Sequence, residues 1–426
     1  MGDLIAVFGA GISGKAVAAL VELEGDKVHL YDEQEADCFS EFGQSKIKDY
    51  KCFIFSPGFP QKHPWRALLR GSDQVYGEVG FAAKRWKGRI IGITGTNGKT
   101  SVTRLLEDCL RASGQAVVAV GNIGHPFSEV VASDLNNAKT VALCEISSFQ
   151  AELIKGLELD GLLWTNFSED HLDFHENLLE YFSAKLNLVG ALKDGALFSV
   201  GQQLLEYKPA EFWQSKGAKI LVTEGALPAK LSPQSVCRAV PQTWNFNLVH
   251  GFLREWGLGD AIIISAANDF ELEPHRLSMI LDGASFRIWE DSKSTNLDSV
   301  LAALKAMKGP VYWMGGGAQK KCDLANFARA ISPHIEKAFL FGAVSRELKG
   351  AFLELNQEAY QFGSISDAFI DCLKQIKQIN QSAHNQPIEI LFSPGFSSFD
   401  QFSSYKARGN YFSSNVFSLL KQNPTL

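Results

Sequence analysis

The segment from Gly92 to Ser101 reads GITGTNGKTS, and its residue types suit the binding of a polyphosphate. Small residues let backbone N–H groups approach phosphate oxygens, and the N-terminus of a following helix adds partial positive charge. Lys99 would reach the outer phosphates, and the Thr100 hydroxyl would ligate Mg²⁺. The strict P-loop pattern has glycine where this chain has Ile93, which indicates a variant loop. Its phosphate contacts would be shared by Gly95, Asn97 and Gly98.

The flanking segments can position this loop. Residues 89–91 read as part of a buried strand, and residues 102–111 have the apolar spacing of a helix. Three more apolar strands, over residues 116–120, 140–144 and 162–165, each end in a polar cluster. Because the C-terminal ends of parallel strands share one edge of a sheet, we expect these clusters to face the phosphate loop.

A magnesium ion at this edge would need hard oxygen ligands in octahedral geometry, and Thr100 with Glu145 would supply two of them. His171 is a softer ligand than Mg²⁺ prefers, but two flanking aspartates favour a functional role over a structural one. Lys185 lies on a predicted helix over residues 178–192, where composition alone indicates a solvated helix lysine.

A second glycine-rich turn opens the chain. Residues 4–8 predict a strand, Gly9 to Gly14 reads GAGISG, and a helix follows. The next strand, residues 27–31, ends at Asp32, as in folds that place a dinucleotide pyrophosphate on a helix N-terminus. The diphosphate of a UDP-sugar fits the same geometry. At this point a nicotinamide or flavin oxidoreductase and a UDP-sugar enzyme are both open.

Beyond about Glu271, a third group of strands carries polar and glycine-rich loops. Residues 285–289 lead to EDSKSTN, residues 311–314 to GGGAQKK, and residues 388–392 to SPGFSSFDQF. We therefore predict an α/β protein with three domains. They are an N-terminal Rossmann-like domain over 1–87, a central P-loop-type ATPase domain over 88–272, and a C-terminal doubly wound Rossmann-like domain over 273–426.

Composition bounds the class of protein. The 426 residues are 46% hydrophobic and 21% charged, as expected of a globular chain with several cores. The net charge of −6 argues against a nucleic-acid-binding protein, since such proteins carry a basic surface. No apolar run reaches the ~18 residues of a membrane span, and the N-terminus lacks the features of a signal peptide. Seven cysteines without metal-ligand spacing suit a reducing cytoplasm.

Eight stretches follow one another along the chain: GTNGKT, GNIG, EISSFQ, NFSEDHLD, YFSAK, PHR, EDSKSTN and SPGFSSFDQF. In this order and spacing they resemble the Mur ligases of peptidoglycan synthesis over nearly the whole chain. EDSKSTN and SPGFSSFDQF match the branch of that family that adds D-glutamate. The resemblance implies a cytoplasmic monomer with a UDP-binding, an ATP-binding and an amino-acid-binding domain.

The reaction that the resemblance implies joins D-glutamate to UDP-N-acetylmuramoyl-L-alanine. ATP phosphorylates the L-alanyl carboxylate, and the D-glutamate amine attacks the acyl phosphate through a tetrahedral intermediate. A carboxylate is a poor electrophile until its oxygen becomes part of a phosphate leaving group, so positioning and charge neutralisation carry most of the catalysis.

The resemblance also implies roles for the matching residues. ATP would be bound by Gly95, Thr96, Asn97, Gly98, Lys99, Thr100, Asn245, Arg276 and Asp291. The UDP part of the substrate would be bound by Gly11, Ile12, Ser13, Asp32 and Gly58, and the muramoyl part by Asn122 and Ser147. D-glutamate would be held by Thr295, Lys320, Ser398 and Tyr405.

Metal binding and catalysis are implied in the same way. Two Mg²⁺ ions would be held by Thr100, Glu145, His171 and Lys185. Lys185 would serve as a carbamate, because an ammonium group cannot ligate a cation whereas a carbamate oxygen can. The catalytic set would be Lys99, His171, Lys185, Arg276 and Lys293.

The chain departs from the family pattern at three places. Trp244 and Leu248 replace the His and the second Asn of an adenine-reading H-N-x-x-N stretch, Glu33 and Gln34 stand where Arg or Thr often helps to bind uridine, and Tyr405 replaces Phe. Two rival hypotheses are a sister ligase that adds another amino acid and a non-catalytic sensor of a UDP-sugar or ATP. The GTNGKT loop and its polar companions argue against the sensor and against the oxidoreductase.

Overall fold

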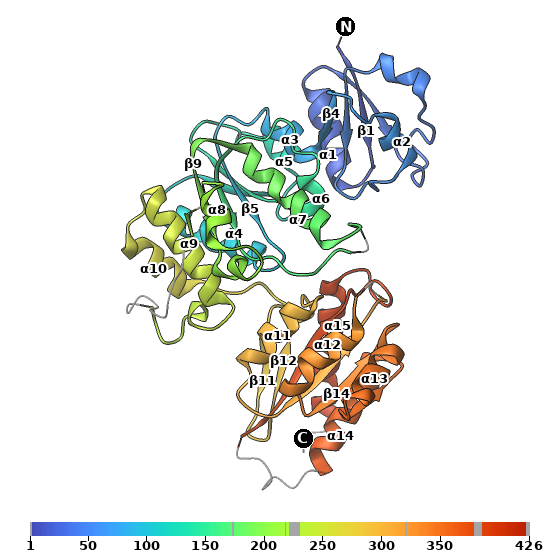
Figure 1. Cartoon of the computed structure of the whole chain (residues 1–426), viewed down its shortest axis with the longest axis vertical. Helices are drawn as coiled ribbons and strands as arrows, with labels where there is room; N and C mark the ends of the chain where they lie inside the picture. Colours follow the sequence, from blue (N-terminus) through green and yellow to red (C-terminus); the bar gives the residue numbers. More distant parts are fainter. Residues whose placement is uncertain are drawn as a thin grey trace. The chain divides into compact units, whose positions relative to one another are not determined.

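The computed structural model describes residues 2–172, 174–217, 219–220, 231–319, 322–378 and 386–422. The chain divides into two compact units, Met1–Phe270 and Glu271–Leu426. Within the described residues the first unit holds a four-stranded and a six-stranded sheet, and the second unit holds another six-stranded sheet (Figure 1). The α/β class with parallel sheets is confirmed, and the exact domain boundaries stay predictions.

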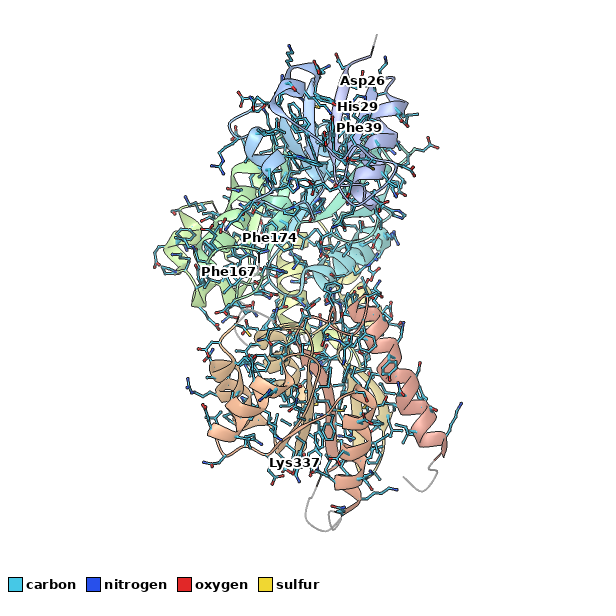
Figure 2. All side chains as sticks on the ribbon, turned by 90° about the vertical axis from the view of Figure 1, so that its right-hand side faces the viewer. Asp26, His29, Phe39, Phe167, Phe174 and Lys337 are labelled. Atoms are coloured by element: carbon cyan, nitrogen blue, oxygen red, sulfur yellow. The ribbon has the colours of Figure 1, made fainter. Side chains whose placement is uncertain are left out.

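The first sheet is parallel, with strand order β2-β1-β3-β4. Its strands are β1 Leu4–Phe8, β2 Lys27–Tyr31, β3 Cys52–Phe55 and β4 Val75–Gly77, and its helices are α1 Ile12–Leu23, α2 Pro64–Leu68 and α3 Glu78–Ala83. Alternate residues of β1 face opposite sides, so Val7 joins the core shared with the second sheet whereas Phe8 joins an aromatic cluster. Within the first sheet, the rings of His29 and Phe39 lie 4.5 Å apart (Figure 2).

The second sheet is also parallel, with strand order β10-β9-β8-β5-β7-β6. Its strands are β5 Arg89–Thr94, β6 Val117–Gly121, β7 Val141–Glu145, β8 Leu159–Trp164, β9 Leu192–Val200 and β10 Lys219–Ile220. Its helices are α4 Lys99–Ala112, α5 Phe127–Val131, α6 Ser148–Ala151, α7 Leu178–Leu186, α8 Ala210–Gln214, α9 Gln242–Trp256 and α10 Asp260–Asp269. Because β5 lies between β7 and β8, the polar C-terminal ends of these three strands are neighbours.

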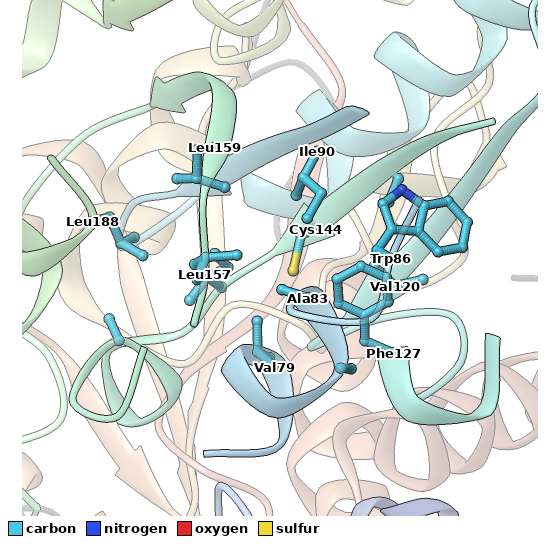
Figure 3. Close-up of a cluster of buried hydrophobic side chains, with 14 of the residues drawn as sticks. Val79, Ala83, Trp86, Ile90, Val120, Phe127, Cys144, Leu157, Leu159 and Leu188 are labelled. Carbon is cyan, nitrogen blue, oxygen red and sulfur yellow. The ribbon is translucent and has the colours of Figure 1, made fainter. Parts of the chain in front are cut away.

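Two features of this sheet bear on the site. Figure 3 shows its core, where Val79 and Ala83 of α3 pack beside Phe127 of α5 and Cys144 of β7. This core continues into the first sheet, so α3 connects the two sheets rather than separating them. The helix predicted over residues 178–192 was too long, because a 3-10 turn replaces it from Asn187 and Leu192 already begins β9.

The second unit has strand order β11-β12-β16-β13-β14-β15, and only the pairing of β11 with β12 is antiparallel among its described pairs. Its strands are β11 Ser278–Asp282, β12 Phe286–Glu290, β13 Val311–Gly316, β14 Lys337–Phe341, β15 Ala359–Gln361 and β16 Ile388–Gly395. Its helices are α11 Leu297–Ala306, α12 Leu324–Ile331, α13 Ser345–Glu354, α14 Ile365–Gln378 and α15 Tyr405–Gln422. Helices α11, α12 and α13 pack on one face, and α14 and α15 pack on the other.

Among the described residues, no helix has both the length and the apolar character that crossing a bilayer requires.

Candidate functional site

The turn between β5 and α4 carries the GTNGKT sequence and depends on two glycines. Gly95 has φ 145° and Gly98 has φ 80°, conformations that side chains disfavour. A Cβ on Gly95 would lie 1.9 Å from Oγ1 of Thr165, and one on Gly98 would lie 2.6 Å from Oδ1 of Asn245. Both positions therefore require glycine, and the Asn245 side chain lies against the loop at Gly98.

The loop is shaped by residues that follow β8. The backbone N–H of Asn97 donates to Oδ1 of Asn166 at 2.8 Å, and the N–H of Thr96 donates to the Asn166 carbonyl at 3.1 Å. The hydroxyl of Thr165 donates to the Asn97 carbonyl at 2.6 Å. The polar end of β8 thus holds the phosphate loop in place, as its neighbouring position in the sheet predicted.

Two lysine side chains meet at one carbonyl oxygen of this loop. Lys99 Nζ donates to the carbonyls of Gly95 and Thr96, both at 2.9 Å. Lys185 Nζ donates to the same Gly95 carbonyl at 3.0 Å. Lys185 is only 1% exposed, and burial followed by the charge of Lys99 lowers its pKa well below the usual value. The interpretation of Lys185 as a solvated lysine is therefore wrong, because α7 turns this side chain into the site.

The carboxylate of Glu145, at the end of β7, is 1% exposed. Its Oε1 accepts a hydrogen bond from Nδ2 of Asn122 at 2.8 Å, while its Oε2 is buried with no hydrogen-bond partner among the described residues. A buried carboxylate oxygen left unpaired is costly unless a cation meets it, so Glu145 fits a metal ligand. Thr100, the second residue of α4, is also buried.

No group of three or more described His, Cys, Asp and Glu side chains is placed to hold a metal ion. A magnesium site here would therefore hold at most two side chains of these types, as the predicted set of Thr100, Glu145, His171 and carbamylated Lys185 does. Asn122, which was assigned to the muramoyl part of the substrate, donates from its amide to Glu145 in the structure, and the assignment stays a prediction.

His171 and Lys185 lie around one buried ring. The ring centroid of His171 is 5.8 Å from that of Tyr181, and Lys185 Nζ is 5.0 Å from the Tyr181 centroid. The Tyr181 hydroxyl lies 3.1 Å from Oγ1 of Thr96 in the phosphate loop. His171 has φ 56° and a side chain that is 37% exposed, so it can be reached by a ligand. The structure thus brings these two predicted ligands to the same loop.

The glycine turn of the first sheet is open at Gly11, whereas a Cβ on Gly14 would lie 1.8 Å from the Gly9 carbonyl oxygen. A Cβ on Gly11 or on Gly58 would meet nothing within 4 Å. Gly11 caps α1 without a side-chain hydrogen bond, Ile12 is 79% exposed, and Ser13 follows in the first helical turn. An open helix N-terminus of this kind suits an anion such as a diphosphate.

Two other residues assigned to the UDP-containing substrate have roles within the fold. The carboxylate of Asp32 accepts the N–H of Ala10 at 2.8 Å and the N–H of Gln34 at 2.9 Å, so it shapes the glycine turn. Ser147 caps α6, and its hydroxyl forms a capping box with Gln150.

The second unit gathers its assigned residues after β12 and β16. Lys293 Nζ lies 4.1 Å from the ring centroid of Tyr405, which begins α15. Thr295 precedes the Asn296 cap of α11, and Ser398, 3% exposed, follows β16. Lys320 lies outside the described residues.

Asp291 is almost fully enclosed within the second unit. Its Oδ1 accepts the N–H of Leu277 at 3.0 Å, and its Oδ2 accepts the hydroxyl of Ser393 at 2.9 Å. Burial raises the pKa of Asp291 to about 7, against the lowering effect of these hydrogen bonds. The neighbouring Arg276 has a side chain that is 17% exposed, and its Nε lies 3.9 Å from Glu273.

Comparison with known protein families and sequences identifies the relatives of this chain. Residues 93–221 match the family described as the Mur ligase middle domain. The UDP-N-acetylmuramoylalanine--D-glutamate ligase of Prochlorococcus marinus (strain MIT 9515) is 30% identical over 400 residues, which cover 88% of this chain and 82% of that protein. The chain belongs to the Mur ligase family.

Other Mur ligases support this assignment over a greater length. The enzyme of the same name from Aquifex aeolicus (strain VF5) is 27% identical over 418 residues, covering 95% of this chain and 96% of that protein. The solved structure of the UDP-N-acetylmuramate-alanine ligase MurC from Thermotoga maritima aligns with a TM-score of 0.58 at 16% identity, covering 98% of this chain and 100% of that one. The Mur ligase fold therefore extends over both units.

Several residues that shape this Mur ligase site were not singled out from the sequence. Thr165 and Asn166 hold the phosphate loop, and Tyr181 lies between the two predicted metal ligands. Each belongs to a stretch that was noted for its polar residues, but nothing in the spacing separates them from their neighbours. In the second unit, Glu290, which is 2% exposed, opens the EDSKSTN stretch but was given no role there, and Arg408, which is 1% exposed, gave no sequence signal.

Proposed function

We infer that this Mur ligase joins D-glutamate to UDP-N-acetylmuramoyl-L-alanine in peptidoglycan precursor synthesis, with ATP as the source of energy. The observation that carries the inference is full-length similarity to proteins named UDP-N-acetylmuramoylalanine--D-glutamate ligase. Two glycine turns at helix N-termini, one of them open at Gly11, agree with two different nucleotide-containing substrates. We take the active form to be a monomer.

The proposed reaction has two steps. A carboxylate oxygen of the L-alanyl group takes the γ-phosphoryl group of ATP, and ADP leaves. The D-glutamate amine then attacks the acyl carbon, the C–N bond forms, phosphate leaves with the former carboxylate oxygen, and the amine loses its proton. Catalysis depends on orienting the two reactants and neutralising the charge on the transferred phosphoryl group.

Lys99 is the residue of the first unit proposed to neutralise that charge. Its ammonium group donates to the Gly95 and Thr96 carbonyls at 2.9 Å, so it has hydrogen bonds that it can exchange for phosphate oxygens. Gly95, Thr96, Asn97, Gly98 and Thr100 would hold the phosphates with it, and Asn245 contacts the loop at Gly98. We also assign the contact with the adenine base of ATP to helix α9, which carries Asn245.

Magnesium would be held by Thr100, Glu145, His171 and Lys185, and when bound it supplies positive charge to the phosphate oxygens. The unpaired Oε2 of Glu145 supports this set. Burial and the charge of Lys99 lower the pKa of Lys185 well below its usual value, which favours the neutral amine that can add to CO₂. In that step the N–C bond forms and a proton leaves, which produces the carbamate anion. The direction of this shift supports the proposed carbamylation of Lys185.

The remaining assignments follow the resemblance. Arg276 and Lys293 would contact the γ-phosphate, and Asp291 the ATP ribose. Gly11, Ile12, Ser13, Asp32, Gly58, Asn122 and Ser147 would hold the UDP-containing substrate. Thr295, Lys320, Ser398 and Tyr405 would hold D-glutamate, for which a cation and hydroxyl groups are suitable partners.

The test measures phosphate release from ATP with UDP-N-acetylmuramoyl-L-alanine and one of four acceptors: D-glutamate, L-glutamate, L-alanine or meso-diaminopimelate. We expect release only with D-glutamate, together with a product whose mass has gained one glutamyl residue. Release with another acceptor would make the protein a sister ligase. Binding of both nucleotides without release from any acceptor would identify a sensor.

A further inference from the structure

Arg276 and Lys293, the two cations of the second unit that we assign to phosphate, lie on two segments that one buried carboxylate connects. Glu290 ends β12 and is 2% exposed. Its Oε2 lies 2.7 Å from Nδ1 of His275, and its Oε1 accepts the N–H of Ser292 at 2.7 Å. We propose that Glu290 is a positioning residue that fixes Arg276 and Lys293 for phosphate binding, a role that rests on the proposed function.

The backbone around Arg276 needs such support. The residues on either side, His275 with φ 69° and Leu277 with φ 46°, both adopt left-handed conformations that residues other than glycine rarely take. A strained turn persists only where its surroundings hold it, and such turns gather at ligand-binding sites. Glu290 holds the turn at the His275 side chain, and Asp291 holds it at the Leu277 N–H with a distance of 3.0 Å.

The same turn supports Lys293. The backbone N–H of Lys293 donates to the His275 carbonyl at 3.1 Å, so the two segments are joined by their backbones as well as through Glu290. Ser292, which Glu290 binds directly, is the residue before Lys293 and is fully buried. A change in the Glu290 side chain would therefore reach Arg276 and Lys293 together.

Helix α15 packs against this cluster. The guanidinium of Arg408 is buried and donates to Oγ of Ser292 at 3.0 Å, to the Ser292 carbonyl at 2.8 Å and to the Phe396 carbonyl at 2.9 Å. A Cβ on Gly409 would lie 2.2 Å from His275 Nδ1 and 2.7 Å from Glu290 Oε1, so α15 approaches the pair as closely as glycine permits. The positive charge of Arg408 offsets the buried carboxylate, which makes Glu290 part of a compact charged support.

The test compares two buried carboxylates of one sheet. Glu389 on β16 is 1% exposed and accepts from Nε1 of Trp289 at 2.7 Å, so Glu389→Gln removes a buried charge without touching the Arg276 turn. Affinity for a non-hydrolysable ATP analogue and for UDP-N-acetylmuramoyl-L-alanine is measured by calorimetry, beside kcat and KM of the ligase reaction. For Glu290→Gln we expect about tenfold weaker binding of the ATP analogue and about tenfold lower kcat, with unchanged affinity for the UDP substrate.

The outcomes separate positioning from stability. Glu389→Gln should keep nucleotide affinity and kcat within about threefold of the wild type even if its Tm falls equally. The proposal is overturned if Glu290→Gln binds the ATP analogue as the wild type does, or if the two variants lose affinity in parallel. Should Glu290→Gln not fold, Glu290→Asp, which keeps the charge with a shorter reach, carries the same comparison. A wild-type protein that binds the analogue but makes no product contradicts the proposed function, while the affinity comparison still decides the role of Glu290.

Discussion

The ends of strands β5 and β12 both present a lysine that we assign to phosphate, and they do so by different means. After β5, the amines of Lys99 and Lys185 donate to one backbone carbonyl, that of Gly95, in a turn that depends on glycine. After β12, buried carboxylates hold the loop, and Glu290 binds the residue just before Lys293. The first site is organised by backbone geometry and the second by buried charge.

Because the two loops are held by different interactions, substitutions in them should affect ligand binding and folding stability to different degrees. Lysine bonds to loop carbonyls can be exchanged for bonds to a ligand, so removing such a lysine changes binding more than folding. A buried carboxylate has partners that are left unpaired when it is removed, so its loss affects folding and binding together. Variants that separate these effects test the comparison.

The largest effect is expected for Lys99→Ala, with a loss of D-glutamate-dependent phosphate release of about a thousandfold, because the variant removes a positive charge that is proposed to neutralise the transferred phosphoryl group. The Tm should change by less than about 2 °C, since the bonds that Lys99 donates to the Gly95 and Thr96 carbonyls are ones that a ligand can replace. Lys62→Ala, which removes an exposed ion pair with Glu176, is the control and should keep full activity. Retention of a tenth of the activity in Lys99→Ala would contradict the assignment.

Gly95→Ala, unlike Lys99→Ala, should mainly reduce the stability of the fold. Its Cβ would overlap Oγ1 of Thr165 at 1.9 Å, and φ 145° is unfavourable for alanine, so we expect a loss of about 3 kcal/mol in the free energy of unfolding. Gly11→Ala in the open turn of the first sheet should lose less than about 1 kcal/mol, because its φ is −67° and nothing lies within 4 Å. Urea unfolding measures both, and equal losses would mean that the two turns do not differ as described.

The sequence predicted the parts of the fold that depend on local pattern. Strand ends followed by polar clusters located the phosphate loop, Glu145 and His171 at one edge, because sheet topology converts sequence order into proximity. The burial of Lys185 could not be predicted, since it depends on how α7 lies against a loop that is about 90 residues away in the chain.

The buried charged residues around Glu290 and Arg408 in the second unit could not be predicted from the sequence for the same reason. Arg408 and Ser292 are 116 residues apart and belong to elements that no periodicity pairs. The resemblance assigned Asp291 to the ribose, and it gave no indication that both carboxylate oxygens accept hydrogen bonds within the second unit. Side-chain networks of this kind follow from tertiary packing, which a pattern of residue types does not specify.

A smaller effect is expected from the ionisation of Asp291. Its pKa is raised to about 7 in the folded protein from 3.8, so between these values the folded state binds more protons than the unfolded state does. The stability of the wild type should therefore fall as pH rises from about 4 to about 7, by up to about 3 kcal/mol relative to Asp291→Asn. Unfolding curves at several pH values measure the difference, and parallel curves for the two proteins would show that burial does not raise this pKa.

The smallest effect concerns the helix caps that follow strands β7 and β12. Ser147 and Asn296 each form a capping box, but α6 spans only Ser148–Ala151 whereas α11 spans Leu297–Ala306. Replacing a cap by alanine costs about 1 kcal/mol in a helix that supports a core, so Asn296→Ala should approach this value in urea unfolding. Ser147→Ala should cost about half as much, because the turn that it caps has few backbone groups to satisfy. Its effect should fall instead on KM for the UDP substrate, since Ser147 is assigned to the muramoyl part. If Ser147→Ala proves the more destabilising of the two, side-chain hydrogen bonds stabilise the region after β7 as they stabilise the region after β12. The difference between the two units would then be confined to the loop after β5 that carries Lys99.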